Sequence, residues 1–66
     1  MTGVTVKDLI FDAYAQALLA ARQKGVMGDA AKDAARNAAA RAVSKATGRP
    51  ISPQMVLRAV EQHPDG

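Results

Sequence analysis

Few side chains in this sequence of 66 residues could carry out acid–base or metal chemistry. There is no cysteine and one histidine, His63. The carboxylates include two pairs at a spacing of four residues, Asp8 with Asp12 and Asp29 with Asp33. Two oxygen donors on one helix are too few for a dedicated metal site, and a general base needs a positioned partner that the sequence does not offer His63. We therefore expect no enzyme activity, no catalytic residue, no metal and no cofactor, and we assign the acids to helix capping and solubility.

Positive charge is concentrated in the second half of the chain. The net charge of the whole sequence is +3. Residues 32 to 58 contain six lysines and arginines against one acid, which leaves a local surplus of five. The six cations are Lys32, Arg36, Arg41, Lys45, Arg49 and Arg58. Such a surplus suits a polyanionic partner such as DNA, although alanine-rich helices also need charged flanks for solubility.

The stretch VSKATGRPISPQMVLRAV, residues 43 to 60, predicts a helix, a glycine-containing turn and a short helix that begins at Ser52-Pro53. It resembles a helix-turn-helix, in which the second helix enters the DNA major groove and preceding elements contact phosphates. The resemblance implies base contacts for an amide and a guanidinium group on the second helix, and phosphate contacts for the cations before it. The candidates are Gln54 and Arg58 for bases, and Arg41, Lys45 and Arg49 for phosphates.

The same stretch departs from the repressor-type motif in three places. The connection after Gly48 is about two residues longer than the compact turn. Ser44 stands where a small apolar residue is common, and Glu61 puts an acid near the presumed DNA face. A pair of helices that only closes a three-helix bundle would have the same signature, so DNA binding and a purely structural role both remain open.

The longest amphipathic segment, residues 6 to 24, contains both aromatic residues of the chain. Thr5 is the expected N-cap with Asp8 completing a capping box, and Gly25 is the expected end signal. Polar residues occupy a narrow arc of this predicted helix, so it has more apolar surface than a one-sided helix needs. Its first apolar stripe runs Val6, Leu9, Ile10, Ala13, Ala17, Ala20 and Ala21. Its second stripe is Phe11, Tyr14, Ala15 and Leu18, with Leu19 at the edge.

The second stripe predicts an interface. Fifteen of the hydrophobic residues are alanine, so the core is expected to be thin for a chain without disulfides. Oligomerisation is the remaining means of stabilisation. We therefore expect a homodimer through Phe11, Tyr14, Ala15 and Leu18, or the docking of a protein partner on the same face.

A second long helix is expected over residues 30 to 47, which contain nine alanines and neither glycine nor proline. Asp29 is its predicted N-cap, and Val26 and Met27 are expected to fold back as an apolar plug. The predicted inward face is Ala31, Ala35, Ala38, Ala39, Ala42 and Ala46, flanked by Val43, with Ala40 on the outer face. Gly48 should end this helix, and a third should run from Ser52-Pro53 to before Pro64.

Together these elements predict an all-α fold, with residues 1–66 as a single helical domain. The expected architecture is a small three-helix bundle, made of a long antiparallel helical hairpin and a short C-terminal helix. The longest apolar run, residues 17 to 21, is far shorter than the roughly 20 residues that span a bilayer, so we expect a cytoplasmic protein without membrane contact.

The predicted function is that of a small DNA-binding regulator or accessory protein that uses the helix-turn-helix-like unit of residues 43–60. The alternative is a helical protein-interaction module, an adaptor or inhibitor, that docks a partner through the apolar face of the first helix.

Overall fold

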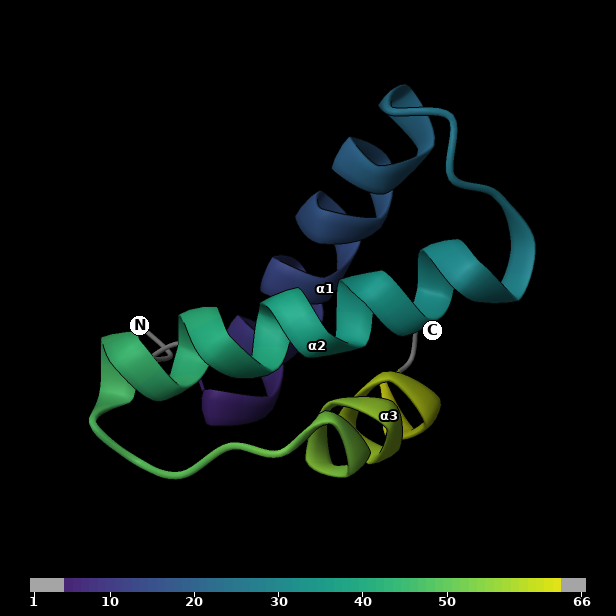
Figure 1. Ribbon diagram of the computed structural model, residues 1–66. Coiled ribbons are helices and arrows are strands. Elements are labelled where there is room, and N and C mark those ends of the chain that lie inside the picture. The colour runs from purple at the N-terminus through teal and green to yellow at the C-terminus, as the bar shows by residue number, and fades with distance from the viewer. Residues whose placement is uncertain (1–4, 64–66) are drawn as a thin grey trace.

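The computed structural model describes residues 5–63, and it confirms an all-α fold of three helices without a strand in that range. The helices are α1 (Val6–Gln23), α2 (Gly28–Thr47) and α3 (Pro53–Gln62). In Figure 1, α1 and α2 run in opposite senses and cross each other at a clear angle, and α3 lies below α2. Each helix packs against the other two, so the predicted three-helix bundle is confirmed.

The ends of α1 follow the predicted signals. The Thr5 hydroxyl accepts a hydrogen bond from the Asp8 backbone N–H at 3.1 Å, and the Asp8 carboxylate accepts one from the Thr5 N–H at 3.4 Å. This reciprocal pair is the predicted capping box. At the other end, Lys24 is the C-cap and Gly25 has a φ of 90°, a left-handed conformation that favours glycine.

The start of α2 differs from the prediction. Met27, not Asp29, is the N-cap, and no side chain caps the helix. Gly28 has a φ of 65° and brings the chain into the helix one residue before Asp29. Asp29 lies instead in the first turn, where a carboxylate still favours the positive end of the helix dipole. The predicted apolar plug forms only in part, because Val26 is half-buried and Met27 is 68% exposed.

The buried face of α2 is rotated relative to the predicted one. Its buried residues are Ala31, Ala35, Ala39, Ala40 and Val43. The predicted inward positions Ala38, Ala42 and Ala46 are exposed, and the predicted outer position Ala40 is buried. The helix packs against two neighbours, α1 and α3, so its buried face has to serve both. The prediction assumed one facing helix. It was correct for Ala31, Ala35 and Ala39 but wrong for Ala40, which is buried where the prediction had it exposed.

The core contains few large side chains, as its composition predicts. The largest fully buried side chains are Val43 of α2 and Val56 of α3. Ile10 and Tyr14 of α1 join them at 3% and 9% exposure, and the other core residues are alanines. Partly buried residues complete the cluster: Leu9, Ala13, Ala17, Leu18, Ile51 and Val60. A core of this kind removes little apolar surface from water and therefore stabilises the chain only modestly.

Candidate functional site

The linker between α2 and α3 is held by side chains at its two ends. Gly48 ends α2 with a φ of 68°, and its N–H donates to the Ser44 carbonyl at 2.9 Å. The Ser44 hydroxyl accepts a hydrogen bond from the Ile51 N–H at 2.9 Å and donates one to the Ile51 carbonyl at 3.2 Å. Ser52 then caps α3, because its hydroxyl accepts from the Met55 N–H at 3.3 Å. The linker of residues 48–52 is therefore held in place by hydrogen bonds, although it is longer than a compact turn.

The predicted base-contact residues are exposed on α3. Val56 and Ala59 are the buried residues of this helix, whereas Gln54 and Arg58 are exposed. Because these two are four residues apart, they share one face of the helix. Glu61 is exposed one turn further on. The face that points away from the core therefore carries an amide, a guanidinium group and, near its end, an acid.

The predicted phosphate-contact residues are exposed on the elements that precede α3. Arg41 and Lys45 are one turn apart on α2, and Arg49 is in the linker. Arg41 lies between the buried Ala40 and Val43, but its own side chain and that of Lys45 are on the exposed side of the helix.

Five of the six cations between residues 32 and 58 have no acidic partner within residues 5–63. Within residues 5–63 the acid–base pairs are Arg36 with Asp33 at 3.2 Å and His63 with Asp8 at 3.6 Å. The one acid between residues 32 and 58 is therefore already paired. Five cations of that range form no ion pair within the described part of the chain: Lys32, Arg41, Lys45, Arg49 and Arg58. Their charge is left to solvent and to external anions.

A second feature is an apolar hollow of about 540 Å³ that α1, α2 and α3 form together. The four predicted interface residues, Phe11, Tyr14, Ala15 and Leu18, all line it. Its other walls are Leu19 and Arg22 of α1, Lys32 and Arg36 of α2, and Leu57 and Val60 of α3. The sequence placed Leu19 at the edge of the second stripe, but it did not reveal the other five, because only the tertiary packing brings the three helices together. The hollow thus combines an apolar floor with three cations.

Three of the predicted interface residues already pack within the chain, Leu18 only in part. Tyr14 is 9% exposed and belongs to the core. Phe11 stacks on the His63 ring, with the centroids 3.9 Å apart and the ring planes 5° from parallel. Ala15 and Leu19 are exposed on the same side of α1. The surface left for a partner is therefore centred on Ala15, Leu18 and Leu19.

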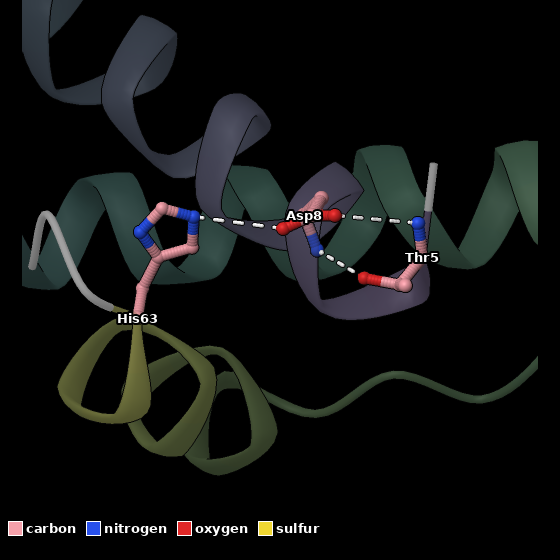
Figure 2. Close-up of polar contacts among 3 residues, drawn as sticks. All are labelled: Thr5, Asp8 and His63. Atoms are coloured by element: carbon pink, nitrogen blue, oxygen red, sulfur yellow. Dashed lines mark hydrogen bonds and ion pairs between the residues drawn. The ribbon is translucent and has the colours of Figure 1, made fainter. Parts of the chain in front are cut away.

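His63 joins the end of α3 to the start of α1. Its Nε2 lies 3.6 Å from one carboxylate oxygen of Asp8, and the other oxygen of Asp8 accepts from Thr5, as Figure 2 shows. The neighbouring Lys7 ammonium donates to the Gln62 side-chain carbonyl at 3.0 Å. His63 is thus packed in the fold, with its side chain 17% exposed.

The described residues, 5–63, contain no group of three histidine, cysteine, aspartate or glutamate side chains that could hold a metal ion. In the same part of the chain, no helix is long and apolar enough to cross a membrane. Comparisons with protein family models, with curated proteins and with solved structures each find no match to this chain.

Proposed function

We propose that this protein is a small cytoplasmic DNA-binding regulator or accessory protein. The observation that carries the proposal is a set of five cations, from Lys32 on α2 to Arg58 on α3, that form no ion pair within residues 5–63. Lysine and arginine side chains of this kind bind phosphates and release counterions from DNA. The cations are accompanied by Gln54, whose amide can recognise an adenine edge.

The proposed interface is the helix-turn-helix-like unit of residues 43–60. Gln54 and Arg58 form the base-reading face of α3, and Arg41, Lys45 and Arg49, on the elements before α3, contact phosphates. Exposure of all five side chains supports this assignment. The Ser44 and Ser52 hydrogen bonds support it further, because they fix where α3 starts relative to α2.

The experiment is a fluorescence-anisotropy titration of mixed duplex DNA at two salt concentrations. Phosphate contacts predict an affinity that falls steeply with salt. Arg58→Ala and Gln54→Ala should reduce the preference among sequences by about 1–3 kcal/mol for a bidentate contact. Lys45→Ala and Arg49→Ala should weaken binding to all sequences alike and lower the salt slope by about one per lost contact.

Two results would contradict this proposal. The first is the absence of any complex at low salt, with the four substitutions changing the free energy of unfolding by less than about 0.5 kcal/mol, as is usual for surface positions. The second is tight binding that survives all four substitutions. That result would move the DNA surface to other cations, such as Lys32 and Arg36.

We further propose that the protein acts as a homodimer through the predicted face of α1, with Phe11, Ala15 and Leu18 in the interface and Tyr14 supporting them from the core. The thin core and the exposure of Leu19, 59%, support a second layer of apolar contact on this side of α1. The alternative function, a helical module that docks a different protein on this face, is favoured by the same apolar hollow of about 540 Å³. Light scattering separates the two, because a docking module without its partner would be a monomer at tens of micromolar.

A further inference from the structure

Three residues of α1 lie on one line along the helix, because seven residues are close to two turns. They are Asp8, Ala15 and Arg22, and all three are exposed. Phe11, Leu18 and Leu19 flank this line. We refer to these six residues as the α1 outer stripe. It has an acid at its N-terminal end, an alanine at its centre and a cation at its C-terminal end.

We propose that a second copy of this chain covers the α1 outer stripe, with the two α1 helices antiparallel and Ala15 at the two-fold axis. In this register, Asp8 of each chain lies opposite Arg22 of the other, because the two are equally far from Ala15. Phe11 of each chain lies close to Leu18 of the other. The inference gives the homodimer proposed above its direction and register, and it rests on that homodimer but not on DNA binding.

Charge determines the direction. A parallel arrangement in register would place Asp8 against Asp8 and Arg22 against Arg22, whereas the antiparallel one pairs each acid with a cation twice over. The Asp8 side chain is accessible to a second copy, because it is 52% exposed although its two oxygens already contact Thr5 and His63. At the centre, Ala15 has only a methyl group, so the two helices can approach closely.

The apolar hollow beside the α1 outer stripe favours binding of a second copy, because binding would cover it. Phe11 and Leu18 line it, together with the 40% exposed Leu57, and the chain has no large core to compensate for this exposed apolar area. Arg36, one of the three cations of the hollow, already pairs with Asp33. Arg22 would gain Asp8 of the second copy, and Lys32 would remain at the solvent edge.

The first test reverses the charges. Asp8→Arg and Arg22→Asp should each weaken dimerisation, measured by light scattering across a dilution series. The loss should be on the order of tenfold, because each replaces two exposed ion pairs with two repulsive contacts. The double variant, Asp8→Arg with Arg22→Asp, should recover dimerisation. A parallel dimer would show no such recovery, and equal losses in all three variants would overturn the proposal.

The second test uses cross-linking, for which the absence of cysteine is convenient. Ala15→Cys should form a disulfide-linked dimer under mild oxidation. Arg22→Cys should remain dimeric by light scattering but not cross-link, because two residues seven positions from the axis are about 21 Å apart along the helices and a disulfide requires less than about 7 Å. Ala42→Cys, an exposed alanine of α2, is the matched control and should not cross-link.

The outcomes distinguish a failure of the proposed register from a failure of the proposed homodimer. A chain that is monomeric at tens of micromolar would overturn both and would leave the α1 outer stripe to a different protein. A dimer in which Ala15→Cys fails to cross-link, or in which Arg22→Cys cross-links, would overturn the antiparallel register alone. Neither result depends on whether the protein binds DNA.

Discussion

Ser44 is the residue that most directly fixes the position of α3. Its hydroxyl makes two hydrogen bonds to the backbone of Ile51, one as acceptor and one as donor. Within residues 5–63, the other hydrogen bonds between the linker and α2 join its first two residues: the Gly48 N–H donates to the Ser44 carbonyl, and the Arg49 N–H donates to the Thr47 hydroxyl. Ser44 and Ile51 are both half-buried. Ser44 therefore does by hydrogen bonding what a small apolar residue would do by packing in a compact turn.

We expect Ser44→Ala to destabilise the fold by about 1–3 kcal/mol, because it leaves the half-buried N–H and C=O of Ile51 without their partner. The measurement is urea unfolding followed by circular dichroism. Lys45→Ala, at the neighbouring exposed position, is the control and should stay within about 0.5 kcal/mol of the unmodified protein. A Ser44→Ala variant as stable as this control would show that the linker does not need the serine.

Local side-chain roles could be predicted from the sequence where donor and acceptor are close along the chain. The capping box of Thr5 and Asp8 spans three residues, and the Ser52 cap of α3 spans three as well. Both were predicted correctly. The bonds from Ser44 to Ile51 span seven residues and a change of direction, so no local pattern reveals them. The stacking of Phe11 on His63 joins opposite ends of the chain and was invisible for the same reason.

At the scale of the helices, the alanine content of α2 explains why the helix itself could be predicted but its buried face could not. The alanine-rich segment correctly predicted a long second helix, since alanine has the highest helix propensity. Alanine covers about half of the circumference of α2, however, so the hydrophobic pattern does not define one narrow inward face. The packing of α2 against both α1 and α3 determined which face is buried, and only the tertiary structure shows this packing.

The buried face of α2 predicts how substitutions of its alanines affect stability. Ala40→Leu should cost about 1–3 kcal/mol, because Ala40 is 4% exposed and a larger side chain would overpack the core. Ala42→Leu, an exposed position two residues away, is the matched control and should change stability by less than about 0.5 kcal/mol. Thermal unfolding of both variants is the measurement. Equal losses would mean that α2 has a different buried face.

A third position tests the space between α1 and α2. Ala38 lines a hollow of about 240 Å³ whose other residues are Ala17, Ala20, Ala21, Lys24, Val26 and Ala34. Ala38→Leu has room to place its side chain there, so we expect it to be neutral or mildly stabilising in the same thermal measurement. A loss as large as that of Ala40→Leu would show that α1 and α2 lie closer together than in this structure.

At the scale of the whole molecule, two surfaces of different chemistry lie on different elements. The candidate phosphate and base contacts are on α2, the linker and α3, and the α1 outer stripe is on the first helix. The sequence predicted which helix or linker carries each candidate contact residue, and the structure has the residues on those elements. The sequence could not show that Lys32 and Arg36 border the hollow with Arg22 and Leu57, because that neighbourhood depends on how three helices pack.

If both proposals hold, dimerisation should strengthen DNA binding, because two joined units bind with an avidity that neither has alone. Leu19→Glu tests this coupling. Leu19 is 59% exposed and lies in the α1 outer stripe, so a charge there should separate the two copies without disturbing the core, whereas Leu18 packs against the core. We expect Leu19→Glu to be a folded monomer that binds DNA at least tenfold more weakly, an order-of-magnitude expectation for lost avidity.

Part of any loss could come from the added negative charge itself. Ala30→Glu is the charge-matched control, because Ala30 is exposed in the first turn of α2 and is not part of the α1 outer stripe. Anisotropy titrations of both variants at one salt concentration, with light scattering of each, separate charge from assembly. If Leu19→Glu were monomeric and still bound DNA as tightly as Ala30→Glu, each copy would act alone, and the dimer would serve stability rather than DNA recognition.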